Sequence, residues 1–357
     1  MLHRRAFTKL VAMMPLAARA SSARAEAPAR LTIAQPSEGF LYLPIYAARG
    51  LGYFHDAGLD VEVTIFGKGA AAALTSVIGG ESDIYVGLPA VPLQAWAKGQ
   101  RTQLFAALLK QCGSDIVLSA EAARRADLGA RRTPAEKAQA LRGLKIAVAG
   151  AGSITDLVVR HVAVYGGLDP DRDLTIIPIG GGGNMIAAFG QGRVDGYCLS
   201  APTSTIGVVT FGGALLFDFA KGEYPPLRDF LFTALSARPE WLAANRSAAV
   251  RLVRALARAI ETMRTRPAAA RAAIGPFYPG VAPAVLDAAW AQALGSLPAS
   301  LDMDAAGIGK NIDFLTEVRG TRLDVPVAEV FTNAIVTLAA APSTSRQEPA
   351  RSAGSKE

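Results

Sequence analysis

Polar side chains and glycines gather in several short loops, each directly after an apolar run that predicts a β-strand. In open α/β sheets, ligands lie beyond the carboxyl ends of the strands, where such loops present hydroxyls, amides and backbone N–H groups. Groups of this kind bind a small polar solute through hydrogen bonds. The candidate ligand contacts are Gln35, Ser37, Gly39, Phe40, Tyr42, Gly87, Leu88, Gly152, Ser153, Thr155, Gly183, Asn184, Ser200 and Pro202.

Each group of candidates also has a purely structural interpretation. Residues 35–40 can form an ordinary turn with an N-cap, and Tyr42 can belong to the core. Ser153 and Asp156 make an S-x-x-D capping box, in which the helix satisfies its own donors, and the carboxylate there disfavours a strongly anionic ligand. The glycines that precede Asn184 can be a flexible connection. The sequence leaves both interpretations open for each loop.

Signatures of the common enzyme sites are missing from the sequence. It contains no G-x-S-x-G nucleophile turn and no G-x-x-x-x-G-K-[ST] phosphate loop. The glycine-rich start at residue 150 has Thr155 where a dinucleotide fingerprint has glycine or alanine. The few histidines and cysteines show no metal-binding spacing. We therefore expect no catalytic residue, no cofactor and no metal.

Strand and helix patterns alternate along most of the chain. Such alternation predicts an α/β fold with mostly parallel sheets that helices cover on both faces. The Ala-rich segments after residue 236 predict helices, which we expect to brace the first part of the fold. The predicted strands lie at 32–35, 61–66, 84–87, 145–149, 174–179, 194–199 and 230–236.

Residues 1–25 have the parts of a removable export signal. Arg4, Arg5 and Lys9 form a basic start, residues 10–16 are apolar, and Ala23-Arg24-Ala25 is an A-x-A cleavage site. The start resembles a twin-arginine signal, and export by the Sec route remains equally open. No cysteine near the cleavage site could carry a lipid anchor, and no other stretch is apolar enough to span a membrane. We expect a free periplasmic protein.

The positive charge of the chain comes mostly from this signal. The whole sequence has 37 Lys and Arg against 30 Asp and Glu; residues 1–25 hold five of the former and none of the latter, which leaves 32 against 30. A net charge of +2 gives little reason to expect nucleic acid binding. The arginine-rich segment 246–266 has apolar residues at helical spacing, so it predicts a packed helix with a solvated basic face.

Two blocks of the sequence resemble a known family. RGLGYF at 49–54 is followed by GLDVEV at 58–63, and GSITD at 152–156 lies in a second block that ends at Tyr197. Both are similar to the periplasmic substrate-binding proteins for nitrate, sulfonate and taurine import, the NMT1/THI5-like family. The resemblance implies a type II periplasmic binding protein fold: two lobes, each a doubly wound mostly parallel sheet, joined by two crossovers.

The resemblance also implies how the chain divides and what it does. We expect residues 30–118 and 228–340 to form the first lobe, 141–221 the second, 119–140 a crossover or insertion, and 341–357 a disordered tail. A monomeric chain would capture a small organic or anionic solute by hinge closure and deliver it to an ABC permease. Cys112 and Cys198 fall in different predicted lobes, where a disulfide would restrain the hinge, so we expect two buried free thiols.

Relatives of this family include two kinds of enzyme. A thiamine-pathway pyrimidine synthase carries a cysteine-rich motif that this chain lacks, and a sulfinate desulfinase has a nucleophilic cysteine where this chain has Ser37. The solute stays open between nitrate, alkanesulfonates, aromatic acids and formylated aminopyrimidines. No Arg or Lys lies in the main cleft loops, and Lys68 is the nearest cation. The loops therefore favour a solute with polar and apolar parts over a bare inorganic anion.

Overall fold

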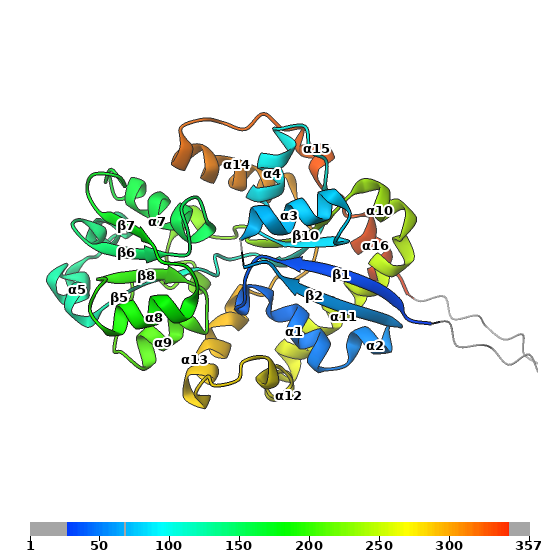
Figure 1. Cartoon of the computed structure of the whole chain (residues 1–357), viewed down its shortest axis with the longest axis horizontal. Coiled ribbons are helices and arrows are strands. Elements are labelled where there is room, and N and C mark those ends of the chain that lie inside the picture. The colour runs from blue at the N-terminus through cyan, green and yellow to red at the C-terminus, as the bar shows by residue number, and fades with distance from the viewer. Residues whose placement is uncertain (1–26, 68, 343–357) are drawn as a thin grey trace, which may run out of the picture.

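The computed structural model describes residues 27–67 and 69–342, so the expected export signal, Lys68 and all of the expected tail after residue 342 lie outside the described residues. The described chain forms two α/β lobes side by side, each built around a five-stranded sheet (Figure 1). The first sheet has the strand order β2-β1-β3-β10-β4, and the second has the order β7-β6-β8-β5-β9.

The first sheet is parallel except for one strand. β1 pairs in parallel with β2 from Ala29↔Leu59 to Gln35↔Ile65 and with β3 on its other side, whereas β10 lies antiparallel between β3 and β4. Every residue of β3 and β10 is buried, because helices cover both faces of the sheet. These strands are β1 (Ala29–Gln35), β2 (Leu59–Ile65), β3 (Ile84–Gly87), β4 (Gln103–Leu109) and β10 (Thr233–Ala237).

The helices of the first lobe form two layers. α3 (Ala70–Gly79) and α4 (Ala90–Trp96) lie above the sheet in the view of Figure 1, and α1 (Leu43–Gly50), α2 (Tyr53–Asp56) and α11 (Arg246–Thr265) lie below it. The short 3-10 helix η1 (Phe40–Tyr42) leads from β1 into α1.

The second sheet follows the same plan. β6 is parallel to β7 and β8, and β5 runs antiparallel between β8 and β9. α7 (Ile154–Tyr165) covers one face, and α8 (Gly182–Gly190) and α9 (Thr203–Val209) cover the other (Figure 1). Its strands are β5 (Asp115–Leu118), β6 (Lys145–Val148), β7 (Thr175–Pro178), β8 (Gly196–Leu199) and β9 (Ala214–Leu215).

Strand pairing places the first crossover earlier than the sequence predicted. We expected the first lobe to extend to residue 118, but β5 hydrogen-bonds within the second sheet, so the chain crosses between β4 and β5. The segment 119–140 contains α5 (Ala120–Arg125) and α6 (Pro134–Ala138) and connects β5 to β6. It is therefore an excursion of the second lobe, not a crossover. The chain returns to the first sheet between β9 and β10.

The C-terminal helices brace the first lobe and also reach the second. α11 buries the apolar stripe expected from its sequence, while Arg254 donates to the carbonyl oxygens of Leu338 and Ala339 and Arg258 pairs with Asp56. α13 packs on α9, and α14 packs on α7. These helices are α10 (Pro239–Ala244), α12 (Pro267–Ile274), α13 (Pro283–Ala293), α14 (Ala305–Arg319), α15 (Val327–Val330) and α16 (Ala334–Ala340).

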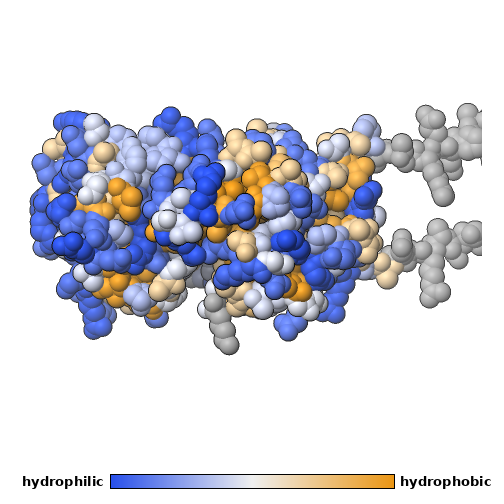
Figure 2. Space-filling model, turned by 90° about the horizontal axis from the view of Figure 1, so that it is seen from above, coloured by the Kyte–Doolittle hydropathy of each residue, from blue (hydrophilic) through white to orange (hydrophobic). Residues whose placement is uncertain are grey.

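The surface seen from above is mostly hydrophilic, with separate hydrophobic patches between hydrophilic residues (Figure 2). Among the described residues, no helix combines the length and the apolar character that a membrane crossing requires.

Candidate ligand-binding site

The two lobes touch where β1 and β8 end. Phe40, just after β1, donates its backbone N–H to the carbonyl oxygen of Ala201, just after β8, at 2.8 Å. Gly39 has φ +131°, and a Cβ on it would lie 2.5 Å from the Oγ of Ser200. Only glycine fits there, because both the backbone conformation and the space exclude a side chain. The structure thus brings three predicted site residues together, Gly39, Phe40 and Ser200, and Pro202 directly follows the bonded Ala201.

Two other first-lobe candidates, Gln35 and Tyr42, support this loop from the buried side. Gln35 is fully buried, and its Nε2 donates to the carbonyl oxygen of Ser37 at 2.6 Å and to the hydroxyl of Tyr46 at 2.7 Å. The Oε1 of Gln35 is buried and has no partner within the described part of the chain. Burial raises the pKa of the Tyr42 phenol, which contacts Ser37. Ser37 itself is exposed, as is its neighbour Glu38, so both polar groups of this loop lie where a solute can reach them.

Gly87 and Leu88 are buried at the end of β3. A Cβ at Gly87 would collide with the hydroxyl of Tyr85, whose ring folds back over it. That hydroxyl is buried and, among the described residues, unpartnered. The glycine therefore makes room for an aromatic side chain of its own strand.

In the second lobe, the loop before α7 satisfies its own polar groups. Ser153 is the N-cap and accepts from the N–H of Asp156, while Asp156 accepts from the N–H of Gly152 at 2.6 Å. The Oγ1 of Thr155 accepts from the N–H of Ala149 at 2.9 Å and lies 2.9 Å from the Oγ of Ser153. Ser153 is thus the N-cap as predicted, but Asp156 accepts from Gly152 while the N–H of Ser153 donates to the carbonyl oxygen of Gly150, so the reciprocal bond of a capping box is replaced. Ser153 stays partly exposed.

Gly183 and Asn184 lie exposed in the first turn of α8. The side chain of Asn184 donates to the carbonyl oxygen of Ile179 at 3.4 Å, a long bond that leaves its amide oxygen free to accept. Gly182 packs so closely on α9 that a Cβ would lie 2.8 Å from the Oγ1 of Thr203. The glycine run therefore sets two helix N-termini of the second lobe side by side.

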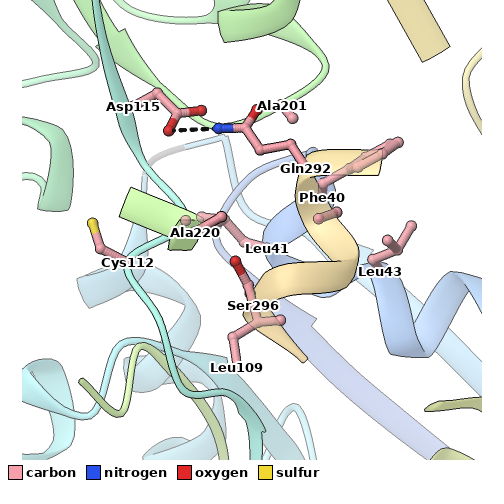
Figure 3. Close-up of a pocket in the computed structure, with 12 residues that line it drawn as sticks. Phe40, Leu41, Leu43, Leu109, Cys112, Asp115, Ala201, Ala220, Gln292 and Ser296 are labelled. Atoms are coloured by element: carbon pink, nitrogen blue, oxygen red, sulfur yellow. Dashed lines mark hydrogen bonds between the residues drawn. The ribbon is translucent and has the colours of Figure 1, made fainter. Parts of the chain in front are cut away.

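A small cavity lies beneath the contact between the lobes. Its volume is about 30 Å³, and its apolar wall is formed by Phe40, Leu41, Leu43, Leu109, Ala201 and Ala220. Asp115, Gln292 and Ser296 supply its polar groups. Figure 3 shows the bond between Asp115 and Gln292 and the hydroxyl of Ser296, which points away from Leu109 and toward Leu41.

Asp115 is the charged residue of this cavity and joins three parts of the chain. It begins β5, and its carboxylate accepts from the Oγ of Ser204 in α9 at 2.8 Å and from the Nε2 of Gln292 in α13 at 3.1 Å. Its residue is 3% exposed, and burial raises the pKa of its carboxyl to about 7. Cys112, another lining residue, is a buried free thiol whose pKa burial also raises.

Aromatic residues from the C-terminal segment pack against the loop that follows β1. The hydroxyl of Tyr278 donates to the carbonyl oxygen of Gly39 at 3.3 Å, and its ring meets Phe40 edge-on with centroids 5.0 Å apart. Phe277 packs on Tyr46 at 5.3 Å. Sequence reasoning missed Tyr278, Asp115 and Gln292; a carboxylate at the start of a buried strand and an aromatic pair before Pro-Gly were their only signals.

Within residues 27–67 and 69–342, no three His, Cys, Asp or Glu side chains group closely enough to hold a metal ion. His161, in α7, instead bonds to Tyr224 and Glu317 near the second crossover.

Comparison with known sequences identifies a family and a named relative. The family described as NMT1-like matches residues 39–275. The protein YtlA of Bacillus subtilis (strain 168), named as a binding protein, is 23% identical over 233 residues, which are 64% of this chain; the match spans 65% of the length of that relative.

Solved structures share the fold over nearly the whole chain. A protein from Bordetella bronchiseptica RB50 is 25% identical with a TM-score of 0.73, covering 88% of this chain and 97% of that one. The alkanesulfonate-binding protein SsuA from Xanthomonas axonopodis pv. citri, bound to MOPS, is 20% identical with a TM-score of 0.65 and coverages of 86% and 99%. The nitrate-binding protein NrtA from Synechocystis PCC 6803 is 17% identical with a TM-score of 0.61, covering 88% of both chains. The predicted two-lobed periplasmic binding protein fold is confirmed.

Proposed function

Because the chain belongs to the NMT1-like family, we propose that it is a solute-binding protein of an ABC importer. It captures a small solute between its lobes and delivers it to a membrane permease. The observation that carries this proposal is the backbone bond between Phe40 and Ala201, which joins the lobes at the strand ends where open α/β sheets bind ligands. The names of the Xanthomonas and Synechocystis proteins, which bind an alkanesulfonate and nitrate, support the same role.

Capture requires that the lobes separate and close again. Within residues 27–67 and 69–342, two chain segments, 110–114 and 216–232, run between the two sheets, so rotation about them opens the cleft without breaking either sheet. Opening separates Gly39 and Phe40 from Ser200 and Ala201. We infer that a solute enters there and that closure buries it.

We propose that the exposed polar groups around this contact meet the solute first. Ser37 lies on the first-lobe side, and Ser153 and Asn184 lie on the second-lobe side. The buried Oε1 of Gln35 lacks a partner within the described residues, and a solute N–H or O–H would supply one. Thr155, Gly152, Gly183, Gly87 and Leu88 shape these loops and stay in the proposed site as backbone contacts.

The residues of the proposed site support binding of a solute without its chemical conversion. A sulfinate desulfinase would need a thiolate in the first cleft loop, where this chain has Ser37. Burial raises the pKa of Cys112 and of Cys198, so both thiols stay protonated and are poor nucleophiles. We further propose that the protein is a monomer, exported to the periplasm by its first 25 residues.

A thermal-shift screen of the purified protein tests this function. The panel holds sulfonates, nitrate, taurine, aminopyrimidines and aromatic carboxylates, and each hit is followed by mass spectrometry of the recovered compound. A solute at about 100 times its dissociation constant adds roughly 2.7 kcal/mol to the free energy of unfolding, which raises Tm by a few degrees. Recovery of an unchanged compound supports a binding protein. Chemical conversion of a hit contradicts it, and absence of a hit in this panel places the solute outside these compound classes.

A further inference from the structure

We propose that the cavity beside Asp115 is the head-group site for the solute, and that it takes a primary ammonium, or a similarly small N–H-donating cation, carried on an apolar body. This inference rests on the proposed function, because it names the class of solute that the cleft would import.

One end of a solute held between the lobes would reach this cavity. Phe40 and Ala201 make the backbone bond between the lobes, and both also line the cavity. Asp115 reaches it from β5, which starts directly after the first crossover, and Gln292 reaches it from α13, which packs on α9 of the second lobe. Closure therefore assembles the cavity from both lobes.

The charge of the lining selects the class of head group. Asp115 is the one charged side chain that lines the cavity, and no Lys, Arg or His in the described part of the chain lines it. A sulfonate or nitrate would lie against a buried carboxylate with no cation beside it, and like charges repel strongly at low dielectric. An ammonium would instead form a charge-assisted hydrogen bond with Asp115.

The size and the acceptors fit an ammonium group. A volume of about 30 Å³ holds one or two water molecules, and an ammonium is about the size of one water. A carboxylate has about four lone-pair positions, and Ser204 and Gln292 occupy two of them in Asp115. The remaining two, with the hydroxyl oxygen of Ser296, could accept the N–H groups of an ammonium (Figure 3). The rest of the solute must then extend past Phe40 and Ala201.

Binding of a cation should release a proton near neutral pH. Burial raises the pKa of Asp115 to about 7, and Asp218, which Lys221 neutralises at 2.8 Å, adds to this rise. The other titratable groups that face Asp115 stay neutral, because burial raises the pKa of each of them; they are Cys112, Tyr197 and Cys198. A bound cation favours the ionised carboxylate, so affinity for amines should rise as the pH rises through 7 and level off above it.

The test is isothermal titration calorimetry of the purified protein with two matched series. One series is benzylamine, benzyl alcohol and phenylmethanesulfonate; the other is propylamine, 1-propanol and 1-propanesulfonate. Each titration is run from pH 6 to pH 8, on either side of the Asp115 pKa, in two buffers that differ in ionisation enthalpy. We expect amines to bind about tenfold tighter than the alcohols, with proton release, and the sulfonates to bind weakest.

Asp115→Asn keeps the shape of the side chain and removes its charge. It should lower amine affinity about tenfold, abolish proton release and leave the alcohols unaffected. Asp313→Asn, at an exposed carboxylate paired with Arg322, is the matched control and should change none of these. If Asp115→Asn does not fold, Ser296→Ala, which removes an acceptor without changing charge, should weaken the amines alone.

Each outcome separates this inference from the proposed function. Tighter binding of the sulfonates than of the amines overturns the solute class and leaves a binding protein. Failure of every amine to bind also overturns the solute class, and a hit elsewhere in the wider panel then still supports import. If no compound binds in the thermal-shift panel or in calorimetry, the proposed function is overturned as well.

Discussion

At the scale of single residues, Gly39 decides whether the lobes can meet. Its backbone has a conformation that other residues rarely adopt, and the Oγ of Ser200 occupies the space of a Cβ. We expect Gly39→Ala to cost about 2 kcal/mol of stability and to weaken solute binding about tenfold, because the loops no longer close. Chemical denaturation measures the first effect, and calorimetry with an identified solute measures the second.

Two controls separate strain from closure. Gly99 also has a positive φ, but a Cβ on it would meet nothing within 4 Å. Gly99→Ala should therefore lower stability through backbone strain alone and leave solute affinity unchanged. Gly39→Ala combined with Ser200→Gly relieves the clash and should restore affinity relative to Ser200→Gly alone. Equal affinity of Gly39→Ala and the unmodified protein would show that this contact plays no part in closure.

The residues of the proposed site that directly follow strands could be predicted from the sequence. Gly39, Phe40 and Ser200 could be predicted because parallel strands of an open sheet end at the same edge. Tyr278 and Gln292 could not, because they come from helical segments that return to the cleft from the far end of the chain. Their place depends on tertiary packing, for which an Ala-rich helix carries no local signal.

At the scale of elements, the loops before α7 and α8 differ in which polar groups they leave free to hydrogen-bond with a solute. Ser153→Ala removes the N-cap of α7 and should cost about 1 kcal/mol of stability. Asn184→Ala removes an exposed amide with one long bond, so it should leave stability nearly unchanged and weaken an identified solute several-fold. Thermal denaturation and calorimetry on both variants check this. If neither variant changes affinity, the second-lobe half of the proposed site is wrong.

The same elements show where the fold could be predicted. β1, β2, β3 and the βαβ units of the second lobe follow from apolar runs that alternate with helical patterns. Residues 115–118 were expected in the first lobe and were not predicted as a strand, because so short an apolar run specifies neither a strand nor its partner; they form β5 of the second sheet. Its partners β8 and β9 lie far away in sequence, and only their pairing shows that the chain had already crossed.

At the scale of the whole molecule, one buried histidine ties the lobes together behind the cleft. His161 in α7 donates through Nε2 to the carboxylate of Glu317 in α14 at 2.9 Å and accepts through Nδ1 from the hydroxyl of Tyr224 at 2.8 Å. The tautomer follows from the carboxylate, which can only accept. Burial lowers the pKa of His161 to about 4.

This histidine should make the protein sensitive to acid. Between pH 4 and pH 6.5 the unfolded chain binds a proton at this site and the folded chain does not, so the free energy of unfolding falls as the pH falls, by roughly 3 kcal/mol. Glu317 and Asp115 have raised pKa values and act in the opposite direction. Urea denaturation of the unmodified protein and of His161→Gln across this range isolates the histidine.

The His161→Gln variant should lose this part of the pH dependence, while His55→Gln, at an exposed histidine in α2, should keep it. Parallel pH profiles for all three proteins would mean that His161 is protonated in the folded state as easily as in the unfolded one.

Because β10 lies between β3 and β4, the first sheet can be completed only late in synthesis of the chain. The first three strands of the first sheet are made early, but the strand that joins them to β4 is Thr233–Ala237, which emerges only after the entire second lobe. A ribosome that has reached residue 200 therefore holds a first lobe with open, hydrogen-bonding edges. The lobe that begins the chain is the last to be finished, and its sheet stays incomplete until about two thirds of the sequence has been translated.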